Sequence, residues 1–168
     1  VSRTTDPANS YLPIVDDFLV NDDTTSRDQL CASVAVDGRG YFVVTWFDRR
    51  NDIEGDVYAQ RYDSLANPLG PNFKVNDFPD GYPPKVAMDD PGNFVITFQS
   101  DQGYDIYAQR YDSSGNRIGS NFRVNDVQEP RQWDPCIGMS STGDFVIAWI
   151  DPRYANDDIF ARGYDSSG

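Results

Sequence analysis

The sequence of 168 residues predicts an all-β fold made of β-propeller blades, in which each blade is a four-stranded antiparallel sheet. Three observations lead to this fold class. A unit of about fifty residues recurs along the chain. Each unit contains short apolar runs separated by turn residues. Helical spacing of apolar residues is missing over any useful length, whereas the aromatic content of 14% favours strands.

The repeat is clearest in a segment that occurs twice without a gap. It reads DVYAQRYDSLANPLGPNFKVND at Asp56–Asp77 and DIYAQRYDSSGNRIGSNFRVND at Asp105–Asp126, and a shorter third copy, DIFARGYDSSG, spans Asp158–Gly168. A second recurring block precedes each of these copies. It reads VAVDGRGYFVVTW at 34–46, VAMDDPGNFVITF at 86–98 and IGMSSTGDFVIAW at 137–149.

Each unit is predicted to contain four strands, A to D. Strand A is expected at 34–36, 86–88 and 137–139, and strand B at 42–46, 94–98 and 145–149. Strand C is expected at 57–62, 106–111 and 159–164, and strand D at 73–75 and 122–124. Both faces of strand B are apolar, as expected for a blade sandwiched between neighbours. The predicted core includes Val44, Trp46, Ile96, Phe98, Ile147 and Trp149.

The third unit has no strand D, and the N-terminus offers one. The segment YLPIVDDFLVND at Tyr11–Asp22 aligns with NPLGPNFKVND and NRIGSNFRVND. We therefore predict that Phe18–Val20 is an outer strand antiparallel to Ile159–Tyr164, in the same chain or in a neighbouring copy. Residues 1–168 then form a single repeat domain, with 11–22 as an outer strand and blades at 28–77, 79–126 and 129–168, of which the last lacks its outer strand.

Three blades are fewer than the four to eight of typical propellers. Two explanations remain open at this point. Copies of the chain could close a ring head to tail, with six blades from two chains as the natural number, or the chain could be a piece of a longer repeat protein. The alternative architecture is a β-sandwich or a β-solenoid.

The composition excludes several partners. The chain carries 27 acidic and 14 basic residues, a net charge of −13, which repels nucleic acids and anionic lipids. Histidine is absent, and with it the usual general base near neutral pH. Cys31 and Cys136 have no zinc-site spacing, and they form either one disulfide or two buried thiols. Neither a signal peptide nor an apolar stretch of about 20 residues, as a membrane helix requires, is found.

The candidate site lies in the loops between strands B and C and between strands D and A, because a meander places both sets on one face. These loops are long and rich in charged and aromatic residues, and variable loops on a rigid scaffold often bind ligands. Trp133, in the polar segment PRQWDP, is a candidate stacking platform for a sugar. The candidate ligand-binding residues are Asp48, Arg50, Tyr82, Tyr104, Trp133, Asp151, Arg153 and Tyr154.

The recurring aspartate before strand C is a candidate calcium ligand, at Asp56, Asp105 and Asp158, because calcium requires hard oxygen donors. The usual D-x-D-x-D-G loop is absent, and these residues could instead accept hydrogen bonds at a loop corner. Likewise, the Asp48–Arg50 and Asp151–Arg153 pairs could be blade-to-blade salt bridges. Calcium is thus a possible cofactor, and no other is indicated.

The pattern W-x-D-x-R followed by D-I-Y-A-Q-R-Y-D-S-S-G-N resembles repeats of large secreted or surface-attached bacterial proteins. It occurs at 46–50 with 56–67 and at 149–153 with 158–168, whereas the middle copy reads FQSDQ at 98–102 and has no arginine. The resemblance covers about residues 11–168 and implies a secreted or cell-surface propeller-like module. The sequence also resembles the Asp-box repeats of sialidase-type propellers at the level of the fold, although the S-x-D-x-G-x-x-W spacing is not met at Asp37 or Asp89.

These observations favour a non-catalytic extracellular binding or adhesion module whose ligand is a glycan, a cation or a partner protein. The alternatives are a glycoside hydrolase that uses paired carboxylates and a purely structural repeat or filament subunit. Only two glutamates exist, Glu54 and Glu129, and the aspartates recur unit by unit. We therefore expect no enzyme, no nucleic acid partner and no membrane insertion, and either a homo-oligomer or part of a longer repeat protein.

Overall fold

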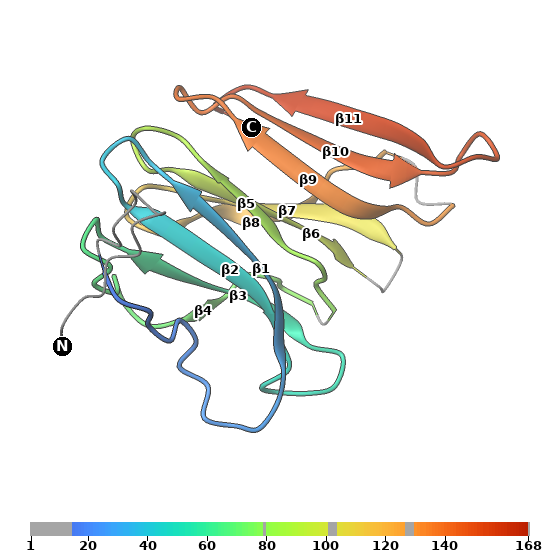
Figure 1. Cartoon of the computed structure of the whole chain (residues 1–168). Coiled ribbons are helices and arrows are strands. Elements are labelled where there is room, and N and C mark those ends of the chain that lie inside the picture. Colours follow the sequence, from blue (N-terminus) through green and yellow to red (C-terminus); the bar gives the residue numbers. More distant parts are fainter. Residues whose placement is uncertain (1–14, 79, 101–103, 127–129, 168) are drawn as a thin grey trace, which may run out of the picture.

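The computed structural model describes residues 15–78, 80–100, 104–126 and 130–167, and these form three antiparallel sheets (Figure 1). Sheet 1 contains β1 (Gln29–Val36), β2 (Phe42–Asp48), β3 (Asp56–Tyr62) and β4 (Phe73–Lys74). Sheet 2 contains β5 (Lys85–Met88), β6 (Phe94–Ser100), β7 (Asp105–Tyr111) and β8 (Arg117–Arg123). Sheet 3 contains β9 (Trp133–Met139), β10 (Phe145–Asp151) and β11 (Asp158–Tyr164). The predicted all-β class and the antiparallel units are confirmed.

The strands of each sheet follow chain order, as in a meander. The second and third strands of each sheet pair in register along their whole length, for example from Phe42 opposite Tyr62 to Asp48 opposite Asp56. The described residues include no helix that could cross a membrane. Cys31 and Cys136 are both free thiols, but they are exposed rather than buried as the second alternative expected.

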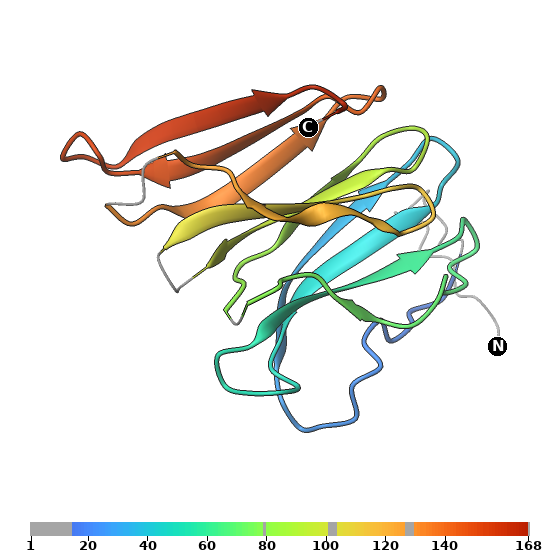
Figure 2. The same ribbon diagram turned by 180° about the vertical axis from the view of Figure 1, so that it is seen from behind.

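Sheet 2 lies between sheets 1 and 3, and the three sheets are stacked face to face (Figures 1 and 2). The first strands of neighbouring sheets contact each other, β1 with β5 and β5 with β9. The sheets therefore form an arc whose first strands lie side by side, with loops between second and third strands at one rim. The arc is open, and sheets 1 and 3 are its two ends.

Apolar side chains fill the two spaces between the sheets. Between sheets 1 and 2 the buried residues are Val43, Val57, Ala59, Val75, Val86, Phe94, Ile96, Phe98 and Tyr111. Between sheets 2 and 3 they are Val95, Ile106, Ala108, Val124, Phe145, Ile147 and Trp149. The repeated alanine of the third strand is fully buried at Ala59 and Ala108, where a small side chain permits close approach of two sheets.

Five of the six predicted core residues are buried, and Val44 differs. Its side chain is only half-buried, because it lies on the face of sheet 1 that points away from sheet 2. The equivalent residues of the other sheets, Ile96 and Ile147, are fully buried between two sheets. No sheet precedes sheet 1 in the part of the chain that the structure describes, and the prediction for Val44 assumed one.

The fourth strands differ from the expected 73–75 and 122–124. β4 has two residues, and Val75 continues it with a bond from its backbone nitrogen to the Val57 carbonyl oxygen (2.8 Å). β8 is longer and begins at Arg117. Proline lacks the N–H that a strand ladder requires, so Pro68 and Pro71 shorten the fourth strand of sheet 1. The second unit has Arg117 and Ser120 in their places.

The N-terminal segment does not complete sheet 3 of the same chain. Within the described residues β11 pairs with β10 alone, and Phe18–Val20 lies against sheet 1 without forming a strand. The Phe18 ring packs edge-on against Tyr62, with 5.3 Å between centroids. The same-chain form of the prediction is wrong, because the open arc places β11 at the end opposite sheet 1 (Figure 1). The form with a neighbouring copy stays a prediction.

Candidate functional site

One residue position at the loop rim recurs in all three sheets, at Leu30, Tyr82 and Trp133. Leu30 and Trp133 each pair with the second strand just before a bulge in the first strand. The backbone nitrogen of Tyr82 donates to the carbonyl oxygen of Gln99 (2.9 Å), which places Tyr82 in the same register. The fold thus presents one large side chain per sheet at the same rim.

The bulge has a local cause in the backbone. The residues that follow Leu30 and Trp133 are Cys31 and Asp134, and both have a φ of 55°. This left-handed conformation is uncommon for residues other than glycine, and it is typical of bulges that redirect side chains near binding sites. The first strand therefore bends at the rim and leaves space between neighbouring sheets.

A pocket of about 630 Å³ occupies this space between sheets 2 and 3, and we call it the Tyr82–Trp133 pocket. Its lining residues are Tyr82, Pro83, Gln99, Arg131, Trp133 and Asp134. The equivalent space between sheets 1 and 2 holds a smaller pocket of about 400 Å³, which Tyr82 also borders. In the smaller pocket Phe47 stands where Gln99 stands in the larger one. The Tyr82–Trp133 pocket is therefore the larger of these two pockets.

Two of its aromatic side chains are accessible to a ligand. Tyr82 is 41% exposed, and its ring packs edge-on against Phe47 with 5.0 Å between centroids. Its hydroxyl lies 3.1 Å from the Cys31 thiol, and this hydrogen bond raises the pKa of the Tyr82 hydroxyl above its ordinary value. Trp133 is half-buried on the opposite side of the pocket. Contacts with Phe47 and Cys31 of sheet 1 thus hold the Tyr82 side chain in place, while the rest of its ring stays accessible to solvent.

Polar groups complete the pocket. The Arg131 guanidinium lies 4.1 Å from the centroid of the Tyr104 ring, so Tyr104 is brought to the edge of the pocket through Arg131. The backbone nitrogen of Gln132 donates to the Tyr104 carbonyl oxygen (2.8 Å), which joins the two loops. Gln99 supplies a buried amide and Asp134 an exposed carboxylate. The pocket can therefore offer apolar faces together with hydrogen-bond donors and acceptors.

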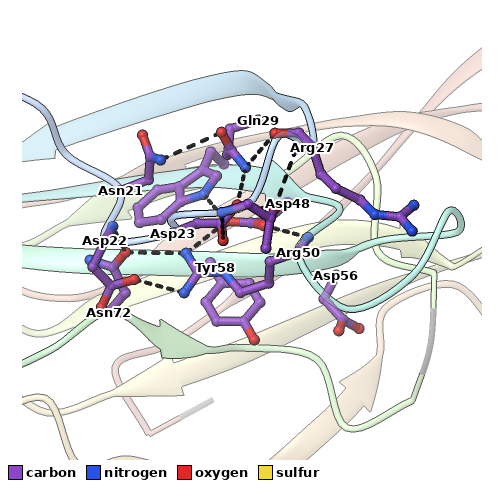
Figure 3. Close-up of polar contacts among 12 residues, drawn as sticks. Asn21, Asp22, Asp23, Arg27, Gln29, Asp48, Arg50, Asp56, Tyr58 and Asn72 are labelled. Atoms are coloured by element: carbon purple, nitrogen blue, oxygen red, sulfur yellow. Dashed lines mark hydrogen bonds and ion pairs between the residues drawn. The ribbon is translucent and has the colours of Figure 1, made fainter.

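Asp48 and Arg50 form a buried ion pair outside this pocket (Figure 3). Asp48 accepts hydrogen bonds from Trp46 Nε1 (2.8 Å), from the backbone nitrogen of Arg50 (2.8 Å) and from Arg50 Nη2 (2.8 Å). Arg50 also reaches Asp22 (2.7 Å) and lies 4.1 Å from the centroid of the Tyr58 ring. The pair thus ties sheet 1 to the N-terminal segment.

Sheet 3 repeats this arrangement with Asp151 and Arg153. Arg153 Nε donates to Asp151 (2.9 Å), and Arg153 also pairs with Asp126 at the end of sheet 2 (3.4 Å). Its guanidinium lies 4.0 Å from the centroid of the Phe160 ring. The Asp151–Arg153 pair itself lies within sheet 3, and it is the Arg153–Asp126 contact that joins neighbouring sheets. The predicted role of these residues in ligand binding stays a prediction. Tyr154 is 71% exposed and lies beside Phe160, away from the residues that line the pocket.

The buried carboxylates should make the fold sensitive to acid. Burial alone would raise the pKa of Asp48 and of Asp151, but hydrogen bonds from Arg50, Trp46 and Arg153 outweigh it and lower both pKa values below the ordinary 3.8. A lowered folded-state pKa contributes stability that is present above the unfolded-state pKa and lost as the pH falls through the folded-state value. We expect the melting temperature to be steady above about pH 5 and to fall steeply below about pH 4. Thermal melts between about pH 6 and pH 2 test this, and a D48S/D151S variant should show a shallower fall.

The candidate calcium ligands each have a protein partner where the sheet has four strands. Asp56 accepts from Asn76 Nδ2 (2.8 Å) and pairs with Lys74 (2.7 Å). Asp105 accepts from Asn125 Nδ2 in the same way (2.6 Å). Asp158 is half-buried on β11. In the described ranges no three such side chains gather as a metal site would require, and calcium binding stays a prediction.

Comparison with known proteins gives a structural neighbour and no sequence relative. No family model matches the sequence, and no curated protein matches it. The structure is similar to that of the Hadza microbial sialidase Hz136, with a TM-score of 0.59 and 14% sequence identity. The match covers 83% of this chain and 36% of the sialidase chain, so the chain spans about a third of its neighbour. This likeness shows the fold alone, an all-β arrangement of sheets like that of a sialidase propeller.

The sequence indicated Tyr82, Tyr104 and Trp133, and the structure brings them to one place. Arg131 lies in a loop between strands D and A that was expected to carry the site, whereas Gln99, Asp134 and Pro83 were missed. Asp134 follows Trp133 in the segment PRQWDP and could have been found there. Gln99 follows strand B of the second unit, and only the pairing register shows that it faces Tyr82.

Proposed function

We propose that this chain is a carbohydrate-binding module of a secreted or cell-surface β-propeller protein, and that the Tyr82–Trp133 pocket holds the sugar. One observation carries the proposal. Two aromatic side chains from equivalent positions of neighbouring sheets border one pocket that also contains an amide, a guanidinium and a carboxylate. The C–H faces of a sugar pack on aromatic rings, and its hydroxyl groups bond to polar groups of this kind.

The charges favour a neutral sugar. The protein carries a net charge of −13, which repels anionic ligands at long range. Within the pocket Arg131 and Asp134 have opposite charges, so the lining has no strong local preference for an anion. A neutral glycan meets no electrostatic penalty, and its hydroxyl groups can both donate and accept hydrogen bonds.

Replacing Trp133 with alanine is expected to weaken binding of a neutral oligosaccharide by about tenfold or more, because a buried aromatic contact commonly contributes most of the energy of a small interface. A glycan array identifies the oligosaccharide, and isothermal titration calorimetry then measures its Kd. Trp133→Phe keeps a stacking surface and should retain most of the affinity. Tyr154→Ala, an exposed aromatic outside the pocket, should change nothing. Equal affinity of Trp133→Ala and the unmodified chain would contradict the proposal.

A second candidate function is glycoside hydrolysis, which the structural likeness to a sialidase favours. Most glycoside hydrolases use two carboxyl groups on either side of the glycosidic bond, whereas sialidases use a tyrosine as the nucleophile. Among the described residues that line the pocket, Asp134 is the carboxylate present. Turnover of aryl glycosides, including aryl sialosides, that is lost in Asp134→Asn would favour the enzyme over the binding module.

A further inference from the structure

The two ends of the arc present the two halves of an interface that the chain already forms twice. Three positions of the second and third strands face the next sheet, and they are buried at Val43, Val57 and Ala59 in sheet 1 and at Val95, Ile106 and Ala108 in sheet 2. In sheet 3 the same positions are Val146, Ile159 and Ala161, and all three are exposed. Val146 is 51% and Ile159 73% exposed, against 2% or less at every equivalent position.

The other end shows the complementary half. Val34 and Val36 of β1 are 63% and 62% exposed on the outer face of sheet 1. The residue equivalent to Val34 in sheet 2 is Val86, and it is buried against sheet 1 in the first core cluster. Exposed apolar patches of this kind mark interaction surfaces. The patch of sheet 3 thus matches residues that are buried in sheets 1 and 2, and the patch of β1 matches Val86, which is buried, and Met88, which is half-buried.

The N-terminal segment already occupies the place of a preceding sheet's fourth strand. Asn121 Nδ2 of sheet 2 donates to the Val75 carbonyl oxygen (3.2 Å), and Asn72 Nδ2 of sheet 1 donates to that of Val20 (3.3 Å). The backbone nitrogen of Asp77 donates to Asn121 Oδ1 (2.6 Å), and that of Asp22 donates to Asn72 Oδ1 (2.7 Å). Residues 18–22 therefore contact sheet 1 as the end of sheet 1 contacts sheet 2.

From these matches we infer that two copies of this chain associate head to tail into a six-blade ring, in which Phe18–Asp22 of each copy forms the fourth strand of sheet 3 of the other. A head-to-tail interface that closes after two copies has twofold symmetry. Six blades lie within the four to eight of known propellers. One association covers both exposed ends and supplies the missing strand.

A paired substitution supports the same strand pairing. In sheet 1 Asn72 Nδ2 donates to Gln60 Oε1 (2.6 Å), and in sheet 2 Asn121 Nδ2 donates to Gln109 Oε1 (2.8 Å). In the alignment of the repeats Asp17 takes the place of these asparagines. Arg162 of β11 takes the place of the glutamines. Within one copy Arg162 already pairs with Asp126 (3.4 Å) and donates to the Val124 carbonyl oxygen (2.5 Å). If residues 17–22 lie beside β11, Asp17 adds a second carboxylate partner, and the amide pair of the other sheets becomes a pair of opposite charges.

Asn21 adds a second match. In sheet 1 Asn76 donates to Asp56 and accepts from the backbone nitrogen of Val57 (2.8 Å each). Sheet 3 has the aspartate and the backbone group, at Asp158 and Ile159, and Asn21 aligns with Asn76. Leu19 departs from the repeat. At the equivalent position of sheet 1, Lys74 forms an ion pair with Asp56, which a leucine cannot form. The new strand pair therefore keeps the amide contact and loses the ion pair.

Charge reversal at Asp17 tests the inference directly. Sedimentation equilibrium of the 168-residue chain should give twice the 18.9 kDa mass of one copy. Asp17→Arg places two cations together and is expected to raise the dissociation constant of the dimer about tenfold or more. The double variant D17N/R162Q restores the amide pair of the other sheets and should remain a dimer. Asp16→Arg, an equal charge change at the neighbouring exposed residue, is the matched control.

Each outcome decides the question. A dimer that Asp17→Arg dissociates and Asp16→Arg leaves intact supports the ring, provided that circular dichroism shows both variants folded. A chain that stays monomeric at high micromolar concentration overturns the inference. In that case further blades of a longer polypeptide would cover the two exposed ends. A dimer that both variants leave intact, or a mass of three or more copies, also overturns the proposed pairing.

Discussion

Replacing Trp149 with alanine is expected to lower the free energy of unfolding by about 3–5 kcal/mol. Trp149 is 3% exposed in the core between sheets 2 and 3, and its ring stacks on Phe160 with 6.4 Å between centroids. Alanine would leave a cavity that the two rigid sheets cannot close, so the lost contacts add to the lost burial. Urea unfolding followed by circular dichroism gives the free energy directly.

Trp133→Ala is the matched control for this variant, because it removes the same side chain from the pocket rim rather than from the core. Trp133 is half-buried and borders the Tyr82–Trp133 pocket, so its truncation should cost much less stability while it weakens sugar binding. Equal losses of stability in the two variants would contradict the assignment of Trp149 to the core and of Trp133 to the site.

Repetition explains how much of the fold the sequence predicts. The second and third strands fall where expected because Val43, Val95 and their equivalents recur in one register, and alternation fixes which face each residue takes. The first strands are longer than expected, as β9 shows by starting at Trp133. Its bulge at Asp134 breaks the alternation on which the prediction depends.

The parts that the sequence does not predict depend on contacts between units. Gln99 lines a pocket that residues of both sheet 2 and sheet 3 form, and no pattern within one unit encodes how two sheets lie relative to each other. The sequence pattern identifies Phe18 as a fourth-strand residue. Which strand it lies beside depends on how far the arc of sheets curves, and in this chain its ring packs against Tyr62 of sheet 1. Local patterns therefore predict the strands, whereas the pocket and the end faces follow from the stacking of the sheets.

The same dependence on neighbours appears in a set of three residues that vary together. Sheet 1 has Trp46, Asp48 and Arg50, in which Trp46 Nε1 and the arginine both donate to the buried carboxylate. Sheet 3 has Trp149, Asp151 and Arg153 in the same contacts. The second unit has Phe98, Ser100 and Gln102 at the corresponding positions. The indole N–H, the carboxylate and the guanidinium are therefore all replaced together at these three positions. Each member therefore has a physical role only when the others are present.

Replacing Asp48 alone with serine is expected to destabilise the protein by about 3–5 kcal/mol, because it leaves the Arg50 guanidinium and the Trp46 indole N–H without their buried partner. The triple variant W46F/D48S/R50Q reproduces the residues of the second unit and should recover most of that loss. It still lacks the contact between Arg50 and the half-exposed Asp22, which as a surface ion pair contributes only about 0–1 kcal/mol. Urea unfolding of the two variants beside the unmodified chain measures both differences. If the triple variant is no more stable than D48S, the three residues do not act as a set and the buried pair has another role.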